Sequence, residues 1–264
     1  MLRPRIIPCL LVRNKGLIKT VKFGPSKYVG DPINAVKIFN EKEADELIVL
    51  DIDATATGAA PDFELIQKLA AECRMPLCYG GGVETVEHAK RIIGLGVEKV
   101  AISSAALINP ELITEIAAEI GNQSVVLVLD VKKSLFGKYE VYTHNGQKNT
   151  GRLAVEVAQQ AEKLGAGEIV INSIDLDGQM KGYDLDLAAK VREAVRLPMT
   201  MLGGAGSLAD IVRLVSACGV VGAAAGSLFV FKGPYRAVLI SYPDQVQKET
   251  IIRSAMDERI CLQK

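Results

Sequence analysis

The sequence predicts one domain over residues 1–264 that folds as a (β/α)8 TIM barrel built from two duplicated half-barrels. Short apolar runs alternate with amphipathic segments of helical period, which is typical of a parallel sheet covered by helices. The segment 46–53 is echoed at 168–175, and the glycine cluster 80–82 is echoed at 203–206. The 264 residues are also close to the ~250 that such a barrel needs.

Each expected strand is short, rich in branched residues and nearly continuously apolar, as strands buried on both faces are. In chain order the strands are expected at 5–12, 46–53, 76–80, 97–103, 124–130, 168–174, 197–202 and 219–225. Between them, helices are expected near 32–43, 62–73, 84–95, 109–120, 152–165, 184–195 and 207–217. An eighth is expected to begin near Pro234, and the pattern over 242–264 is ambiguous. Pro110 and Gly121 mark the start and the end of the fourth helix.

Two long polar insertions follow the first and the fifth expected strands. They span residues 13–31 and 131–151, and they occupy equivalent places in the two halves. Long loops at such places commonly carry function. Both insertions are therefore candidate active-site flaps.

Composition excludes several classes of protein. Thirty-one basic and 31 acidic residues balance, so no overall field attracts nucleic acid or an anionic membrane. No apolar run approaches the ~20 residues that span a bilayer, and the N-terminus lacks a signal peptide's apolar stretch. The five scattered cysteines are expected to be reduced thiols of a cytoplasmic protein: Cys9, Cys73, Cys78, Cys218 and Cys261. With only two histidines, His88 and His144, both expected to be solvated, neither a metal site nor a cofactor is expected.

Glycines and serines at the carboxyl ends of the strands predict phosphate binding. Glycine lets backbone N–H groups approach an anion, and a following helix adds its positive end. One such cluster in each half suits a ligand with a phosphate at each end. The alternative is that the glycines merely permit tight turns. The candidates are Gly81, Gly82, Ser103, Ser104, Asp177, Gly178, Gly204, Gly226 and Ser227.

Asp130 is the candidate catalytic residue. It ends the apolar strand 125–129, where its carboxylate would face the mouth of the barrel and act as a general acid or base. The alternative is a structural cap that binds nearby loop amides.

Charged residues begin four of the strands at the opposite rim. They alternate in sign and are Arg5, Glu46, Lys99 and Glu168. Charges at strand entries are usually solvated surface residues. The alternative is a closed ion-pair ring across the bottom of the barrel.

The chain resembles the HisF family, the cyclase subunits of imidazole glycerol phosphate synthase, over nearly its full length. The motifs that carry the resemblance include Arg5-Ile6-Ile7-Pro8-Cys9-Leu10, Gly80-Gly81-Gly82, Lys148-Asn149-Thr150-Gly151, Gly182-Tyr183-Asp184 and Gly203-Gly204-Ala205-Gly206. The resemblance implies a (β/α)8 barrel that receives ammonia from a HisH-like glutaminase docked on its N-terminal face. It makes Arg5, Glu46, Lys99 and Glu168 the ammonia gate, and Glu98 and Gln123 part of the partner interface.

The resemblance also implies a bis-phosphorylated substrate at the C-terminal face, contacted by Lys19 and Asp51 and processed by two opposed aspartates. One aspartate corresponds to Asp130, but Leu11 stands in the place of the other. A leucine transfers no proton, and loss of a positioned acid or base slows a reaction by ~10²–10⁴-fold. Asp51 and Asp53, on the next strand, are possible substitutes.

Two further departures lie at the same mouth, where the family's serine is Leu202 and a family threonine is Asn172. A retained gate with an altered mouth favours the HisF-like relatives of surface-polysaccharide pathways. Those proteins pass ammonia to a separate amidotransferase that converts an acetamido group of a nucleotide-linked sugar into an acetamidino group. The alternatives are the authentic cyclase of histidine biosynthesis and a non-catalytic phosphate-binding scaffold. Leu11 argues against the first and the retained gate against the second.

Overall fold

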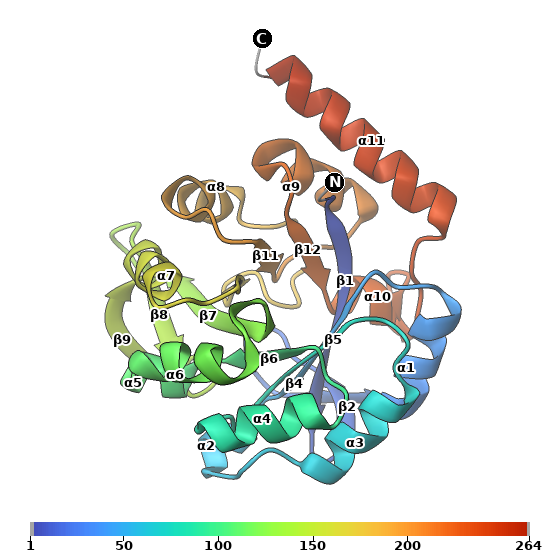
Figure 1. Ribbon diagram of the computed structural model, residues 1–264. Helices are drawn as coiled ribbons and strands as arrows, with labels where there is room; N and C mark the ends of the chain where they lie inside the picture. The colour runs from blue at the N-terminus through green and yellow to red at the C-terminus, as the bar shows by residue number, and fades with distance from the viewer. Residues whose placement is uncertain (1–2, 263–264) are drawn as a thin grey trace.

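A computed structural model describes residues 3–262 and shows a closed barrel of eight parallel strands (Figure 1). The strands are β1 (Arg5–Arg13), β4 (Leu47–Asp51), β5 (Leu77–Gly80), β6 (Lys99–Ile102), β7 (Val125–Lys133), β10 (Glu168–Ser173), β11 (Met199–Leu202) and β12 (Gly222–Ala225). Neighbours in this order pair in parallel, β12 pairs with β1, and β7 pairs with β10. The predicted fold class and all eight expected strands are confirmed.

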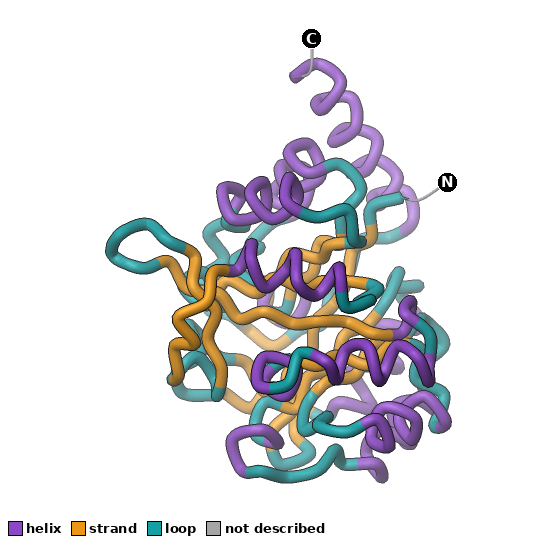
Figure 2. Tube along the Cα trace, turned by 60° about the vertical axis from the view of Figure 1, so that its left-hand side comes forward, coloured by secondary structure: helices purple, strands orange, loops and turns teal. Residues whose placement is uncertain are grey.

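Seven of the expected helices surround the strands (Figure 2). They are α1 (Pro32–Glu41), α3 (Phe63–Glu72), α4 (Val86–Gly94), α6 (Glu111–Ile120), α7 (Ala154–Lys163), α8 (Leu185–Ala194) and α9 (Leu208–Cys218). Short polar side chains begin several of them: Asp31 accepts from the N–H of Asn34, and Ser207 forms a capping box with Asp210. Within residues 3–262, no helix combines the length and the hydropathy required to cross a membrane.

The expected eighth helix near Pro234 is wrong. Residues 233–236 form a turn between two short antiparallel strands, β13 (Phe231–Lys232) and β14 (Ala237–Val238). Gly233 and Arg236 both have positive φ in this turn, which a helix does not allow. The last helix, α11 (Gln245–Leu262), begins later and packs on α9, where Arg259 donates to the carbonyl of Ala217 at 2.7 Å.

Short helices not expected from the sequence follow three barrel strands at their carboxyl ends. They are α2 (Ala54–Thr57), α5 (Ser104–Ile108) and α10 (Ser227–Val230). A 3-10 turn, η1 (Asn122–Ser124), precedes β7 at the other rim. Each is a single turn or little more, too short for a hydrophobic period to reveal it.

The two expected flaps are β-hairpin extensions of barrel strands. In the first half, β2 (Gly16–Lys19) pairs antiparallel with β1, and β3 (Lys27–Gly30) pairs with β2. In the second half, β8 (Tyr139–Thr143) pairs with β7, and β9 (Lys148–Leu153) pairs with β8. The flaps therefore extend the sheet in equivalent places of the two halves.

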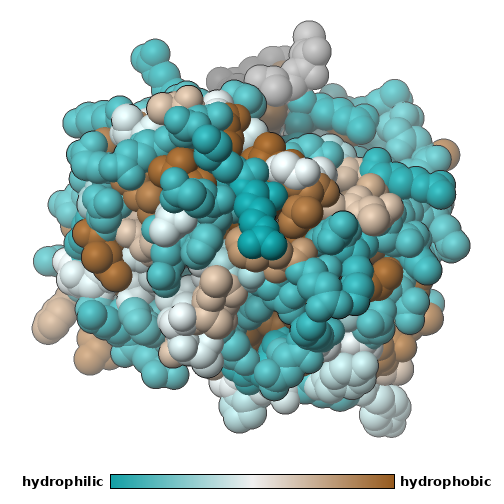
Figure 3. Space-filling model, turned by 60° about the horizontal axis from the view of Figure 1, so that its bottom comes forward, coloured by the Kyte–Doolittle hydropathy of each residue, from teal (hydrophilic) through white to brown (hydrophobic). Residues whose placement is uncertain are grey.

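Apolar side chains fill the inside of the barrel as well as the space between strands and helices. Inward residues of the strands pack along the axis, among them Ile7, Cys9, Ile48, Cys78 and Val170. Outward residues such as Leu10 and Leu47 pack with Phe39 of α1 and the other helices. The exposed face in Figure 3 is mostly hydrophilic, with only small scattered hydrophobic groups. The packing therefore makes the barrel a filled core with polar groups at its two ends.

A side chain at Gly222 should destabilise the barrel. A Cβ there would lie 2.0 Å from Oγ1 of Thr200, so Gly222→Ala should lower the free energy of unfolding by ~1–3 kcal/mol. Gly94→Ala, in α4, is the matched control, because a Cβ there meets nothing within 4 Å. That control should be neutral or stabilising by up to ~1 kcal/mol. Urea denaturation of both variants measures their free energies of unfolding. An equal loss of stability in the two variants would show that the contact with Thr200 is not the cause.

Candidate functional site

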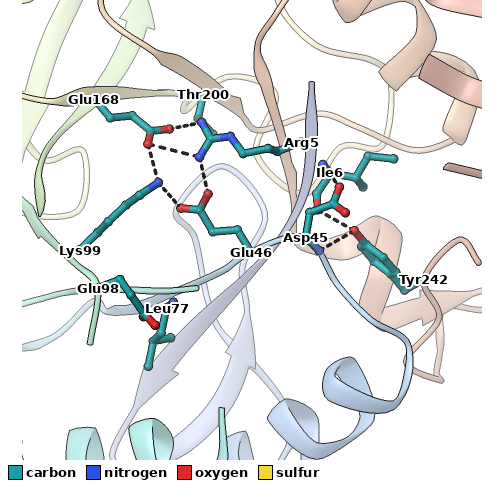
Figure 4. Close-up of polar contacts among 10 residues, drawn as sticks. All are labelled: Arg5, Ile6, Asp45, Glu46, Leu77, Glu98, Lys99, Glu168, Thr200 and Tyr242. Atoms are coloured by element: carbon teal, nitrogen blue, oxygen red, sulfur yellow. Dashed lines mark hydrogen bonds and ion pairs between the residues drawn. The ribbon is translucent and has the colours of Figure 1, made fainter. Parts of the chain in front are cut away.

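Four charged side chains form a closed ring at the N-terminal end of the barrel (Figure 4). Nζ of Lys99 lies 2.7 Å from Glu46 and 2.8 Å from Glu168. The guanidinium of Arg5 binds Glu46 and lies 2.7 Å from Oε1 of Glu168. Thr200 donates to the same Glu168 oxygen at 2.6 Å. The ring expected as an alternative from the sequence is therefore present.

The ring carboxylates are buried, and each of them is paired with both ring cations. Glu46 is 3% exposed and Glu168 is 5% exposed. Burial alone would raise the pKa of Glu168, but hydrogen bonds and charges from Arg5 and Lys99 outweigh it and lower that pKa to about 2. Burial also opposes the charge of Lys99, whose pKa is nevertheless raised by the two carboxylates. Glu168 and Lys99 are therefore both ionised at neutral pH.

Apolar side chains separate this ring from the other end of the barrel. Ile48, Cys78, Ala101, Val126 and Ala224 are among them. Burial raises the pKa of the Cys9 thiol to about 11 and that of Cys78 well above its usual value. Both thiols are free and protonated at neutral pH, as expected for core cysteines. The Cys261 side chain lies outside the described residues.

A cavity of about 210 Å³ opens at the C-terminal ends of the strands, and Asp130 and Leu11 both line it. Burial raises the pKa of Asp130 to about 6, and a 2.9 Å hydrogen bond from Nδ2 of Asn172 opposes that rise. Asp130 lies within β7, where it pairs with Asn172 of β10 on one side and with Tyr142 of β8 on the other. Asp130 is therefore a rigidly held carboxyl group that titrates near neutral pH.

Leu11 gives the cavity an apolar wall. It packs with Leu50 and Leu202 in the cluster that fills the barrel. Its backbone is held by β2, through Ile18, and by β4, through Leu50. At this place in the site, the chain supplies no group that can transfer a proton.

The two suggested substitutes for the missing aspartate differ in their surroundings. Asp53 makes a two-pronged ion pair with Arg13, with both hydrogen bonds at 2.8 Å, and this pair ties β1 to α2. Asp51 lines the cavity, where its Oδ1 accepts the N–H groups of Asp53 and Ala54. Burial raises the pKa of Asp51. Asp51 is thus the better-placed carboxyl group of the two.

Lys19 brings a buried amine to the cavity. Its Nζ donates to the carbonyl of Cys9 at 2.7 Å, and burial lowers its pKa. A Cβ at Gly226 would lie 2.2 Å from this nitrogen, so the amine lies against the loop that begins α10. Asp177 instead fixes the flap, because its carboxylate accepts from Oγ1 of Thr20 at 2.9 Å. Of these two residues, only Lys19 offers a hydrogen-bond donor to an anion.

The glycine loops reach the cavity from both halves of the barrel. Gly81 has φ +123°, and a Cβ there would lie 2.4 Å from the carbonyl oxygen of Asp51. Gly204 has φ +105°, and a Cβ there would lie 2.1 Å from the carbonyl oxygen of Gly182. Backbone packing alone therefore requires these two glycines. All the candidate phosphate residues line the cavity, namely Gly81, Gly82, Ser103, Ser104, Asp177, Gly178, Gly204, Gly226 and Ser227.

The two expected interface residues lie at the opposite rim, and the two histidines differ in their positions. Glu98 and Gln123 are exposed at the rim that carries the ring, where Glu98 accepts the N–H of Leu77 at 2.7 Å. His88 lies in the first turn of α4, while His144 lines the cavity, which the sequence did not indicate. Among residues 3–262, no three His, Cys, Asp or Glu side chains are grouped to hold a metal ion.

Comparison with known proteins identifies the family. A family model described as histidine biosynthesis protein matches residues 5–235. The chain belongs to this family. It is 60% identical, over 94% of its length, to 96% of an imidazole glycerol phosphate synthase subunit from Vibrio vulnificus. A second such subunit, from Pseudomonas aeruginosa, is 54% identical, and the match covers 92% of this chain and 97% of the relative. The HisF subunit from Alkaliphilus metalliredigens is 41% identical, and the match covers 87% of this chain and 91% of the relative. The resemblance to HisF is confirmed.

The names of these relatives bear on the choice between the two pathways. All three name imidazole glycerol phosphate synthase, and none names the amidation of a sugar. The first two names carry a provisional qualifier, and the third does not. They favour the histidine-pathway interpretation over the sugar-amidation interpretation drawn from Leu11.

Neutralising one ring carboxylate should reveal its pH-dependent contribution to stability. Glu168→Gln leaves Arg5 and Lys99 with one carboxylate and should lower the free energy of unfolding at pH 7 by ~3 kcal/mol. Because the folded pKa of Glu168 is lowered to about 2, its contribution is full above the unfolded value of ~4.3 and is lost as pH falls toward about 2. Urea denaturation from pH 7 to pH 3 should therefore show the difference between the two proteins shrinking below pH 4. A difference in the free energy of unfolding that does not change with pH would contradict the conclusion that the ion pairs lower the pKa of Glu168.

Removing the Asn172 amide should shift the titration of Asp130. Its N–H donor favours the ionised carboxylate, so Asn172→Leu should raise the pKa of Asp130 further above about 6. Carbon-13 NMR of the labelled carboxyl group measures this midpoint. The Glu168→Gln variant is the control, because its change lies at the opposite end of the barrel. An unchanged or lower midpoint in Asn172→Leu would show that the hydrogen bond does not set the titration.

Proposed function

We propose that the chain is the ammonia-using barrel subunit of a glutamine amidotransferase complex, of the imidazole glycerol phosphate synthase type. The observation that carries the proposal is the pairing of a closed ion ring at one end of the barrel with an acid–base cavity at the other. A HisH-like glutaminase would dock on the ring end, over Glu98 and Gln123. The names of the relatives support this reaction type.

The ring has the properties of an entrance for a small neutral molecule. Its members come from different strands, so one ion pair can separate without unfolding the backbone. Lys99 carries its charge on a flexible four-carbon stem, and its side chain is partly exposed. Opening of the Lys99 pairs is the step that would admit ammonia to the apolar interior.

The cavity has the properties of a site for an anionic substrate. Lys19 and the glycine loops supply N–H donors to phosphate groups. Asp130 then faces the substrate as a general acid or base, and a pKa of about 6 keeps both of its protonation states accessible near neutral pH. Asp51 is the second carboxyl group for acid–base steps, from a strand next to that of Leu11.

A second candidate function is favoured by the departures from the family pattern at the mouth, namely Leu11, Leu202 and Asn172. In that function the barrel passes ammonia to a separate amidotransferase, which converts the acetamido group of a nucleotide-linked sugar into an acetamidino group. An apolar wall opposite Asp130 suits a mouth that releases neutral ammonia without using it. A phosphate-binding scaffold without either role would have no need for the ring.

Turnover of the bis-phosphorylated histidine precursor with ammonium salt separates the two functions. The purified wild-type subunit should form imidazole glycerol phosphate, and Leu11→Asp should raise the rate by ~10²-fold or more by restoring the second carboxylate. Leu11→Asn is the matched control, since it has the same size as aspartate without an ionisable group. No wild-type turnover, with activity appearing only in Leu11→Asp, would reject the first function and favour the second.

A further inference from the structure

Next to the ion ring, the seam between β1 and β4 is closed by side chains. Backbone pairing of these strands begins at Cys9 and Ile48 and runs to Val12 and Asp51. The same offset extended backward places Ile6 opposite Asp45. There, the N–H of Ile6 donates to the side chain of Asp45 at 2.9 Å instead of to a backbone carbonyl. The seam at the ring end therefore depends on groups other than the strand ladder.

The hydroxyl of Tyr242 supplies the rest of this closure (Figure 4). It donates to the carbonyl of Ile6 at 2.7 Å and accepts the N–H of Asp45 at 3.1 Å. One hydroxyl thus bridges β1 to the segment just before β4 and satisfies a backbone group on each. Because burial raises the pKa of Tyr242, the hydroxyl keeps its proton.

Tyr242 is itself held firmly. Only 9% of it is exposed, and its ring packs against Phe39 and Phe229 at centroid distances of 6.3 and 5.3 Å. Lys248, 4% exposed, braces the same seam from α11, with Nζ 3.0 Å from Oδ1 of Asp45 and 2.8 Å from the carbonyl of Glu43. Tyr242 and Lys248 both lie beyond residue 235, where the family match ends.

The bridged residues adjoin two members of the ring. Arg5 precedes Ile6 on β1, and Glu46 follows Asp45 directly before β4 begins at Leu47. Successive residues of a strand point to opposite faces, so Ile6 faces the helices while Arg5 faces the barrel axis. The width of this seam therefore sets the separation at which Arg5 meets Glu46.

We propose that Tyr242 is a positioning residue of the ring, which fixes the Arg5–Glu46 ion pair by bridging β1 to β4. The consequence for ammonia transfer rests on the proposed function; the positioning itself does not. Loss of the hydroxyl leaves the carbonyl of Ile6 and the N–H of Asp45 without their bridge. The seam then widens, and Arg5 loses its fixed geometry.

Tyr242→Phe tests the proposal, with Tyr183→Phe as the matched control. Tyr183 is also buried, and its hydroxyl also donates to a backbone carbonyl, that of Ala224, at 3.0 Å. The first readout is the side-chain N–H NMR signal of Arg5, which should broaden in Tyr242→Phe and stay sharp in Tyr183→Phe. Should Tyr242→Phe not fold, Lys248→Met loosens the same seam and should broaden the same signal.

The second readout is turnover of the bis-phosphorylated histidine precursor by the complex of this chain with its glutaminase. It is measured with glutamine and, separately, with ammonium salt as the nitrogen source. Tyr242→Phe should lower glutamine-dependent turnover by roughly tenfold and leave ammonia-dependent turnover unchanged, whereas a general loss of stability lowers both. An unaltered Arg5 signal, or equal effects in Tyr183→Phe, overturns the proposal. A broadened Arg5 signal in a complex whose wild type uses neither nitrogen source supports the positioning role and rejects the proposed function. Wild-type turnover that Tyr242→Phe leaves intact with both sources overturns the inference and keeps the function.

Discussion

Two buried carboxylates at the base of the barrel impose the constraint on which the rest of the structure depends. Glu46 and Glu168 are almost fully removed from solvent, and burial of an uncompensated charge is strongly unfavourable. Arg5 and Lys99 must therefore reach the axis from intervening strands, and Thr200 must donate to Glu168. Gly222 must lack a side chain, because Thr200 occupies that space. The register of β1, β4, β6, β10 and β11 is thus fixed by charge compensation as well as by apolar packing.

The two ends of the barrel differ in how their polar groups are arranged. At the base, opposite charges alternate around the axis and neutralise one another. At the mouth, Asp130 and Asn172 lie on adjacent strands, while Leu11, Leu50 and Leu202 form the other wall. At this level the mouth is therefore one-sided, with Asp130 and Asn172 facing an apolar surface.

Most of the fold was predictable because periodicity and the internal repeat are properties of long segments. All eight barrel strands and seven helices follow from them, and the strand ends then place Asp130, Leu11, Lys99 and Glu168 at the correct rims. The prediction of a helix near Pro234 was wrong, because the proline that follows Gly233 in this turn is also typical of the first turn of a helix. The hydrogen bond between Asn172 and Asp130 could have been predicted from the sequence, because the two residues lie opposite each other near the ends of neighbouring strands. Tyr242 carries no local signal, since its role depends on contacts with residues far away in the chain.

The hairpins that extend β1 and β7 have a consequence for how this site can change over evolution. Each places a residue of the mouth, Leu11 or Asp130, inside a three-strand ladder, so the backbone position is held whatever side chain it carries. The backbone geometry at these positions does not depend on the side chain, so a substitution at either position alters reactivity with little effect on the fold. Such a barrel can change its reactivity at the mouth while the ion ring at the opposite end keeps its geometry.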